Sequence, residues 1–511
     1  MIKELLDLQS KKKVDIIEKI FNTKNHSCTQ ARLLKELKMT YPTLRNLIET
    51  INYDAKLFGF ENFSITHSPP NQLYTLEMDE ESNIQMVIHS YIRQTTKFRL
   101  LELLLTTSFA TIQVVADRLF ISYTSIRKDI KELNKLLEPY CITISTSNGI
   151  YLEGEEMGIR MFYSMIFLTV FGGESWPFLF IRYSEISELL EKCPKEIYNA
   201  RSFDKSIAIH FYIAIHLLRV RQNNPVLPSQ LHNVPIYKPY SDRSKQSFHS
   251  FVAQLKSYLP NLNEQKLIFS SRIILSVITA FGSYSSIKKV PTFFYSEPLL
   301  TKNDFFTTAI AICEKVNNHL SVPFSETEKE NLLYSLMSVN YRYLLFKKID
   351  LCLEPIILGY SKIDRDIRKR HKVRHLELLI NRMMNLEEFS VLNAHKQELA
   401  ADYLIIFEKR IDFSKHTKTI NVAVLSIISN ETSVANFMNY FSNYYNVCVK
   451  DGWNSRTDLI ICDFPLSEHV QASFGINQPI VYVHTRWSGS DYEKINKALA
   501  RIAIDKFVNN V

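Results

Sequence analysis

The sequence lacks the cysteine patterns that indicate a disulfide framework or a zinc site. Its seven cysteines are scattered, odd in number and never spaced as a CxxC pair. Disulfide-rich domains and zinc sites need paired or closely spaced cysteines. The pattern suits a reducing compartment, so we expect a cytoplasmic protein.

Uninterrupted apolar runs and catalytic signatures are also missing. Residues 1–13 contain charges but no continuous apolar core, so we expect no secretory signal. The most apolar run, residues 161–181, is interrupted by Gly172, Gly173 and Pro177, which predicts buried helices rather than a membrane span. Because no Walker A, GxGxxG, HExxH or nucleophile-elbow motif occurs, we expect no enzyme, catalytic residue, metal or cofactor.

The charge balance is only mildly basic. The 511 residues carry a formal net charge of +8, and residues 1–150 hold 19 basic and 17 acidic side chains. This balance is compatible with a nucleic-acid partner but does not require one. The argument for such a partner therefore depends on where the charges lie. The length predicts several domains.

Two segments repeat one pattern at a constant offset of 82 residues. Each copy predicts a helix, a tight turn and a second helix: residues 29–37 and then 40 onward, and residues 111–119 and then 122–137. Thr40 and Ser122 are the expected N-caps of the second helices. This is the helix-turn-helix pattern, which docks its second helix in the DNA major groove. The matched pairs are Leu34 and Ala116, Leu37 and Leu119, Met39 and Ile121, Tyr41 and Tyr123, Thr43 and Ser125, Leu44 and Ile126, Arg45 and Arg127, Ile48 and Ile130, Ile51 and Leu133, and Asn52 and Asn134.

A β-hairpin is predicted after each helix pair. Residues 63–66 and 73–76 alternate in polarity around a turn, and residues 142–144 and 151–152 flank Ser147-Asn148-Gly149. The Asn-Gly step favours a type I′ turn. Since a hairpin after a recognition helix is a wing, we predict winged helix-turn-helix domains over residues 1–80 and 81–155.

Only the outer face of each second helix can contact bases. In the second copy Ile126, Ile130 and Leu133 form the inner face. Arginine and lysine can donate to guanine or to phosphate, and serine and threonine can contact either. The second copy carries more positive charge, so we predict that it makes the main specific contact with double-stranded DNA. The predicted DNA-contacting residues are Tyr41, Thr43, Arg45 and Asn46 in the first copy, and Ser122, Tyr123, Thr124, Arg127, Lys128 and Lys131 in the second.

The remaining sequence changes character twice. Helical periodicity dominates up to residue 413, and proline-bearing breaks at 225–239 and 291–298 predict two helical bundles, over 156–298 and 299–413. Residues 414–511 alternate predicted strands and helices, which predicts a small α/β domain with a largely parallel sheet. The expected strands are 421–428, 457–462 and 479–483, and the expected helices are 433–444 and 491–507. The predicted fold class is multidomain and mainly α.

These features together resemble a known family. The paired helix-turn-helix units, the phrase VADRLFISYTSIRKDIKELNKLL and the wing SNGIYLEGEE are similar to the Mga/AtxA virulence regulators of Gram-positive bacteria, and the similar layout covers nearly the whole chain. The resemblance implies that the bundles are phosphotransferase-system regulation domains (PRDs) and that the last domain is EIIB-like and helps to form a homodimer. It implies a cytoplasmic transcriptional regulator, usually an activator of virulence or carbohydrate-responsive genes. The implied partners are double-stranded DNA, a second copy, and phosphorylated HPr or other phosphotransferase components, with no membrane.

The resemblance also implies control by histidine phosphorylation. Regulation domains of this kind carry a helical histidine followed by small apolar residues and an arginine. His210 fits this pattern, although Arg219 comes later than expected and His216 is a rival. Arg219 or Arg221 could balance a phosphoryl charge. The alternative is that His210 is a hydrogen-bonded core residue.

In the second bundle His375 and His395 rank level as phosphorylation candidates. His375 lies in a basic run that also fits a solvated face, and His395 lies at helical spacing from Leu392 and Leu399, which is more typical of a core.

The predicted α/β domain departs from a working EIIB, which uses a reactive cysteine at the end of its first strand. The corresponding stretch, Leu425 to Asn430, contains none, so we expect a scaffold for self-association. Two alternative functions are a phosphotransfer component that uses His210 and an RNA antiterminator that shares regulation domains. The missing cysteine argues against the first. The helix-turn-helix units argue against the second, which would carry a small all-β RNA module.

Overall fold

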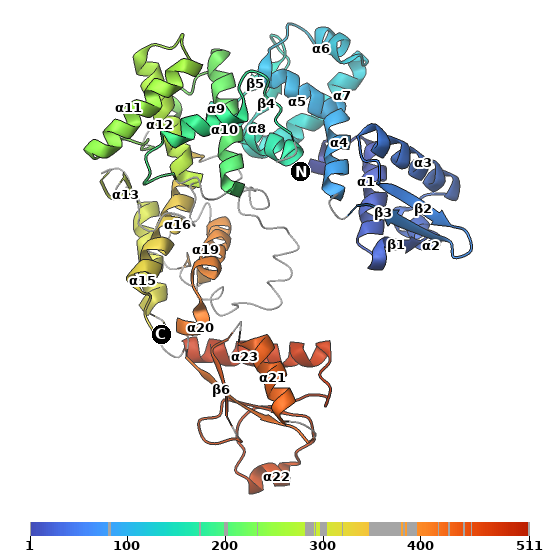
Figure 1. Cartoon of the computed structure of the whole chain (residues 1–511), viewed down its shortest axis with the longest axis vertical. Helices are drawn as coiled ribbons and strands as arrows, with labels where there is room; N and C mark the ends of the chain where they lie inside the picture. The colour runs from blue at the N-terminus through green and yellow to red at the C-terminus, as the bar shows by residue number, and fades with distance from the viewer. Residues whose placement is uncertain are drawn as a thin grey trace.

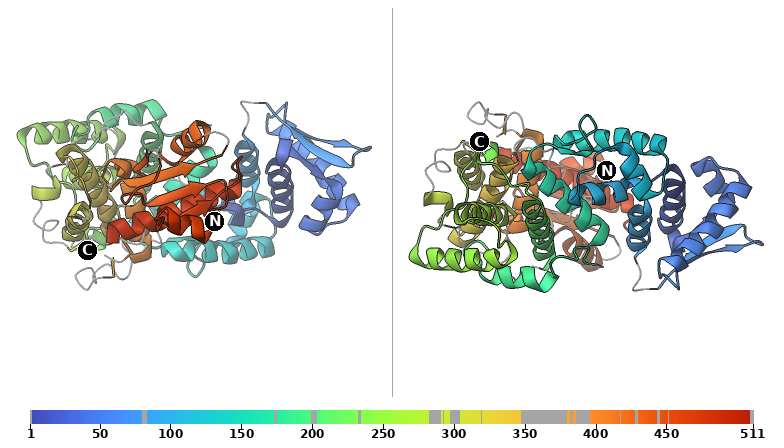
Figure 2. Two further views of the ribbon diagram at one scale, coloured as in Figure 1. Left: turned by 90° about the horizontal axis from the view of Figure 1, so that it is seen from below. Right: turned by 90° about the horizontal axis from the view of Figure 1, so that it is seen from above.

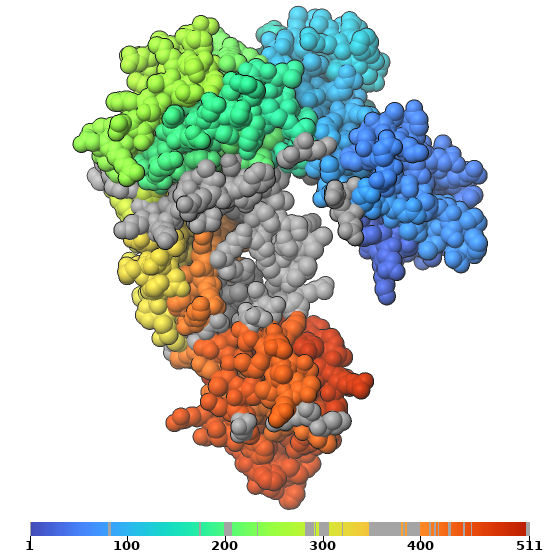
Figure 3. All heavy atoms as spheres, in the orientation of Figure 1, coloured from blue at the N-terminus to red at the C-terminus, as the bar shows by residue number. Residues whose placement is uncertain are grey.

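The computed structural model is mainly helical, with small sheets near the two ends of the chain (Figure 1). The amino-terminal and carboxyl-terminal parts form separate lobes on the long helical region between residues 156 and 416 (Figure 3). The structure describes residues 2–346, 380–381, 384–385 and 396–508, apart from gaps at 80–82, 173–174, 199–202, 232–233, 282–290, 292, 297–303, 319, 417, 428–429, 443–444 and 451.

The first repeat folds as the predicted helix pair and hairpin, packed on a preceding helix. The 3₁₀ turns Ile2–Glu4 and Lys24–His26 flank this preceding helix. The hairpin gains a third strand that the sequence analysis did not predict, so that the antiparallel order is β1-β3-β2. The elements are α1 (Leu8–Phe21), β1 (Ser27–Thr29), α2 (Gln30–Leu37), α3 (Tyr41–Leu57), β2 (Ser64–Ser68) and β3 (Leu73–Glu77).

The second repeat has the same order of elements. Its hairpin pairs β4 with β5 antiparallel, and an isolated bridge joins Phe109 to Ile150 at the position equivalent to β1. In Figure 2 the first repeat projects from one end of the molecule, beyond the helices of the second. The elements are α4 (Ile84–Gln94), α5 (Thr96–Thr106), α6 (Ile112–Leu119), α7 (Tyr123–Leu137), the 3₁₀ turn Glu138–Tyr140, β4 (Thr143–Ser145) and β5 (Tyr151–Glu153).

The described part of the central region is helical, as predicted, although the expected break at 291–298 contains a short helix, α13. The proline-bearing break at 225–239 contains only a 3₁₀ turn, Pro228–Leu231, among its described residues. One contiguous apolar core runs from Leu5 to Ile411. The helices are α8 (Glu156–Phe171), α9 (Tyr183–Glu191), α10 (Phe203–Arg221), α11 (Asp242–Tyr258), α12 (Glu264–Phe281), α13 (Phe293–Ser296), α15 (Asp304–Asn318), α16 (Glu326–Leu345), α19 (Lys396–Arg410) and α20 (Phe413–His416).

The apolar run at 161–181 breaks where the sequence predicts. Helix α8 ends at Phe171, and Gly172 follows with a φ of +52°, a value that side chains with a Cβ adopt only with strain. Of the helices that the structure describes, none is long and apolar enough to cross a bilayer.

The carboxyl-terminal part is an α/β unit with the predicted parallel sheet. The strand order is β7-β6-β8-β9, and each neighbouring pair is parallel. Helices α21 and α23 cover one face, where their apolar side chains pack on Val422, Val424 and Ile461. Strand β7 and helix α22 are additions to the predicted elements. The elements are β6 (Ile420–Leu425), α21 (Asn430–Phe441), β7 (Val447–Lys450), β8 (Leu459–Cys462), α22 (Glu468–Ser473), β9 (Ile480–Tyr482) and α23 (Gly489–Val508).

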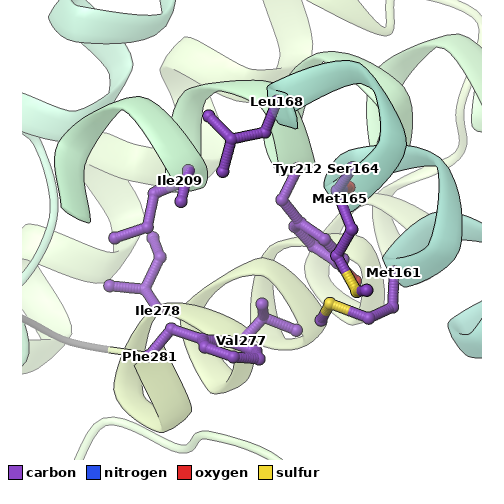
Figure 4. A pocket seen from close by; sticks show the side chains of 10 residues that line it. Met161, Ser164, Met165, Leu168, Ile209, Tyr212, Val277, Ile278 and Phe281 are labelled. Carbon is purple, nitrogen blue, oxygen red and sulfur yellow. The ribbon is translucent and has the colours of Figure 1, made fainter. Parts of the chain in front are cut away.

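A small apolar cavity lies where α8, α10 and α12 meet. Its volume is about 30 Å³, and Met165, Ile209, Val277 and Ile278 are among the side chains that surround it (Figure 4). This volume is large enough for a water molecule, but a water also needs polar partners. The apolar walls make this cavity space that a larger side chain can fill.

We expect Val277→Ile to stabilise the chain by up to about 0.8 kcal/mol, because the added methylene enters the cavity. Val277→Ala should cost roughly 1–3 kcal/mol, because it enlarges the cavity. Thermal unfolding of the two variants and the parent chain checks the prediction. A Val277→Ile variant that melts as low as Val277→Ala would show that the cavity cannot accept the extra carbon.

Candidate nucleic-acid interface

The two helix-turn-helix units share the same backbone at their turns. We refer to residues 27–77 as the first module and residues 109–153 as the second module. Lys38 and Phe120 both adopt left-handed conformations, with φ of 51° and 57°. The next amide closes the turn in each case: Met39 N donates to the Leu34 carbonyl at 3.3 Å and Ile121 N to the Ala116 carbonyl at 3.0 Å. The repeat in the sequence therefore corresponds to a repeat in backbone geometry.

The second helix of each pair begins at the predicted cap residue, but only one of the two cap side chains is used. Ser122 Oγ accepts the Ser125 amide at 3.2 Å, which confirms the predicted cap of α7. Thr40 occupies the N-cap position of α3, but its side chain does not accept an amide. Its hydroxyl instead lies 2.9 Å from that of Thr43. Thr40 is therefore the N-cap residue, as predicted, but it makes no capping bond through its side chain.

A matched asparagine joins each recognition helix to its wing, an arrangement that we call the asparagine clamp. Asn52 Oδ1 accepts the Ile65 amide at 2.7 Å, and its Nδ2 donates to the Ile65 carbonyl at 3.0 Å. Asn134 makes the same two bonds to Ile144, at 2.7 and 3.2 Å. The clamp fixes the wing relative to the helix, since both polar groups of one strand residue are satisfied by one side chain.

The inner face of α7 is buried as predicted. Ile126 and Leu133 are fully buried and Ile130 is 5% exposed. The predicted DNA-contacting residues of the second module are all exposed and lie together on the outer face and amino end of α7. They are Ser122, Tyr123, Thr124, Arg127, Lys128 and Lys131.

The outward cations of α7 differ in their partners. Within the described part of the chain, Lys131 has no ion-pair partner. Arg127 lies over the Tyr123 ring, with 5.9 Å between the guanidinium carbon and the ring centroid. Lys128 Nζ is 4.0 Å from Glu132, which Lys97 also binds at 2.5 Å. The bond from Lys97 lowers the pKa of Glu132, so this carboxylate stays charged. Arg127 and Lys131 are therefore the most available cations.

The first module presents its predicted residues in the same way but with less free charge. Tyr41, Thr43, Arg45 and Asn46 are exposed at the amino end of α3. Arg45 Nε donates to Glu49 at 2.9 Å, and this bond raises the pKa of Arg45. Because the carboxylate offsets the only cation in this set, the first module is the weaker electrostatic partner for phosphate.

One exposed aromatic residue was not among the predicted contacts. Phe120 is 90% exposed at the turn before α7, where its backbone is left-handed. A phenyl ring at this position can pack on a sugar or a thymine methyl group. The sequence could have indicated this contact, because Phe120 places an aromatic side chain at the turn position where the first module has Lys38.

These features define a winged helix-turn-helix, a fold that places its second helix in the DNA major groove. The chain carries such a domain of the Mga type: the family model described as the Mga helix-turn-helix domain matches residues 80–167, which include α4 to α7 and the second wing. The likeness to the Mga/AtxA regulators is thereby confirmed.

Two relatives are regulators by description. A protein described as a trans-acting regulator of Streptococcus pneumoniae serotype 4 is 23% identical over 219 residues, which are 42% of this chain and 42% of that protein. The capsule synthesis positive regulator AcpB of Bacillus anthracis is 26% identical over 134 residues, which are 26% of this chain and 28% of AcpB. The matches thus span less than half the length of these relatives.

The candidate phosphorylation residue His210 is buried in α10. Its side chain is 2% exposed and stacks on the Tyr183 ring at 4.0 Å, and Nε2 is 2.9 Å from Ser187 Oγ. The arginines expected to balance a phosphoryl charge bind elsewhere. Arg219 pairs with Glu156, and Arg221 donates to the Tyr258 carbonyl. A phosphoryl group could reach His210 only if α9 moved away from α10.

The other candidate histidines are buried or lie outside the described residues. His216 is fully buried between Arg160 and Ser270. His375 and His395 lie outside the part of the chain that the structure describes. Among the described residues, no three His, Cys, Asp or Glu side chains are grouped as metal ligands.

Removing the asparagine clamp should loosen the wing. In Asn134→Ala the Ile144 amide and carbonyl lose their partner, which should lower the free energy of wing opening by roughly 1–3 kcal/mol. Hydrogen exchange of a peptide covering residues 142–153 measures this opening. Asn52→Ala should have the same effect on residues 64–77, whereas the exposed Asn477→Ala should leave both wings unchanged. Unchanged exchange in the Asn134 variant would contradict the clamp.

Proposed function

We propose that this chain is a DNA-binding transcriptional regulator that acts in the cytoplasm. The observation that carries the proposal is the pair of equivalent modules, each with a wing and with a recognition helix whose outer face is free. The Mga helix-turn-helix match over residues 80–167 supports it. AcpB is described as a positive regulator of capsule synthesis, which favours activation of virulence genes as the mode of action here.

The second module is proposed as the main specific reader. Helix α7 offers Arg127 and Lys131, while Arg45 in the first module is offset by Glu49. The amides at the amino end of α7 that Ser122 does not cap add a phosphate site, because the positive end of the helix dipole lies there. The first module then orients the protein on the duplex and adds affinity, and the second contributes most of the discrimination between bases.

Arg127→Ala and Lys131→Ala should each weaken DNA binding by roughly 1–3 kcal/mol without unfolding the module, since both side chains are exposed. Fluorescence anisotropy with duplexes captured from genomic DNA measures the loss. Lys256→Ala, on the exposed side of α11, removes the same charge far from α7 and is the matched control. If all three variants bind as the parent does, α7 is not the reader.

We propose that the α/β unit is an EIIB-like scaffold for homodimer formation and not a phosphotransfer enzyme. After β6, Ser426 Oγ and Ile427 N donate to the Asp463 carboxylate at 2.6 and 3.0 Å. This internal carboxylate occupies amide and hydroxyl donors that could otherwise hold a phosphoryl group. Cys462 is buried at the end of β8, where burial raises the pKa of its thiol and disfavours the reactive thiolate.

The helical bundles are proposed as PRD-like control domains that respond to phosphorylated HPr or related components. Phosphorylation of His210 would add a charge of about −1.5 to −2 between α9 and α10. Since His210 is buried where α9 packs on α10, the modified state would favour a different arrangement of the helices. The modification could then shift the dimer or the DNA-binding modules only by the free-energy difference between the two arrangements.

Two variants test this control. His210→Asp mimics added charge and His210→Ala removes the imidazole, so they should change reporter transcription in opposite directions. Sedimentation of the purified chains reports the dimer at the same time. Ser187→Ala removes the hydroxyl beside the imidazole without adding charge and should act like the parent. Parental transcription and dimerisation in both His210 variants would make His210 a packing residue.

A further inference from the structure

A polar cleft separates the second module from the helical region. Its volume is about 710 Å³. One wall is the loop between α5 and α6, with Thr107 and Ser108, together with Asn148 at the tip of the wing. The other wall is the carboxyl end of α10, with Arg219 and Gln222. Figure 1 shows β4, β5 and α5 beside α8 and α10. The cleft is in the size range of small-molecule sites, and both parts of the chain line it.

A cluster of buried charges lies behind the α10 wall. Glu156 accepts bonds from two guanidinium groups, those of Arg160 and Arg219. Arg160 is fully buried, and its other nitrogens donate to His216 Nδ1 at 2.8 Å and to the Asn224 carbonyl at 2.7 Å. His216 therefore accepts at Nδ1 and donates from Nε2 to Ser270, which is the neutral form. One carboxylate thus faces two cations, and the cluster keeps a net charge of +1.

The uncompensated charge is accessible from the cleft through Arg219. Its Nε and one Nη bind Glu156, and the second Nη makes no hydrogen bond to the residues that the structure describes. Arg219 is the one charged side chain in the described lining; the other polar members are hydroxyls and amides. A buried cation without a full counter-charge is costly, and an anion in the cleft would offset that cost.

We propose that this cleft binds a small polyhydroxylated anion, one that carries a phosphate or carboxylate group whose oxyanion pairs with Arg219. The hydroxyls and amides of Thr107, Ser108, Asn148 and Gln222 would pair with its hydroxyl groups. The ligand would bridge the wing and the α5–α6 loop to α10, so that it restrains the second module relative to the helical region. This last consequence rests on the proposed function, whereas binding itself does not.

Titration calorimetry on the full chain tests the site with four probes at matched ionic strength: glucose 6-phosphate, gluconate, glucose and inorganic phosphate. We expect saturable binding of at least one of the two polyhydroxylated anions, at least tenfold tighter than glucose or phosphate. The relative affinity for glucose 6-phosphate and gluconate identifies the preferred oxyanion. If neither anion binds, or if both bind no better than phosphate, the proposal is wrong.

Variants locate the binding. Arg219→Gln should weaken it at least tenfold, and Gln222→Ala about threefold or more. Because Arg219 also binds Glu156, circular dichroism must show that the Arg219→Gln variant folds. If this variant does not fold, the binding of Gln222→Ala and Thr107→Val tests the site instead. Gln246→Ala, on the exposed side of α11, is the matched control and should bind as the parent does. Parental affinity in all the cleft variants would put the ligand elsewhere.

The effect of the bound anion on DNA binding is measured separately. The bound anion should change the affinity of the parent chain for duplex DNA at least threefold, and Gln222→Ala should need more anion for the same change, as linkage requires. If the bound anion does not change the affinity for DNA, the proposed coupling is wrong, but the anion site and the DNA-binding site both stand. A chain that binds the anion and no DNA would instead contradict the proposed function.

Discussion

The orientation of α7 depends on the burial of its inner apolar face. Ile126, Ile130 and Leu133 are each at least 95% buried, and burial of such a side chain contributes roughly 1.5–3 kcal/mol. Rotating the helix by half a turn would expose all three and bury Arg127 and Lys131. The hydrophobic effect therefore holds the basic face outward, and the Ser122 cap and the asparagine clamp then fix where the helix starts and where the wing lies. The DNA-binding proposal depends on this arrangement.

The two modules show how one scaffold can serve two electrostatic roles. The left-handed turn, the clamp and the buried face are the same in both. Their electrostatic difference lies on the outer face, where Glu49 offsets Arg45 in the first module while Arg127 lies over a tyrosine ring in the second. Evolution of the outer face alone would change affinity and specificity without disturbing the fold. The cleft beside the second wing adds a means of coupling this module to the helical region.

Local sequence patterns predicted the helix pairs, the wings and the parallel sheet, because each depends on residues close together in the chain. Strand β1 and the Phe109–Ile150 bridge were not predictable, since each pairs with a strand on the far side of the helix pair and no local turn links the two partners. The pairing of Arg219 with Glu156 was also not predictable from the sequence. The two residues are 63 positions apart, and only the packing of α8 on α10 brings them together. The burial of His210 between α9 and α10 has the same non-local origin.

The salt dependence of DNA binding is the sharpest test of whether the two modules bind duplex DNA through their exposed cations. If two modules hold duplex DNA through exposed lysine and arginine side chains, the logarithm of the association constant for the full chain should fall linearly with the logarithm of salt concentration, because binding releases condensed counterions. The slope should become less steep by about one when Lys131 is replaced by alanine. Absence of binding to duplex DNA even at low salt, or binding that is independent of salt, would contradict the account.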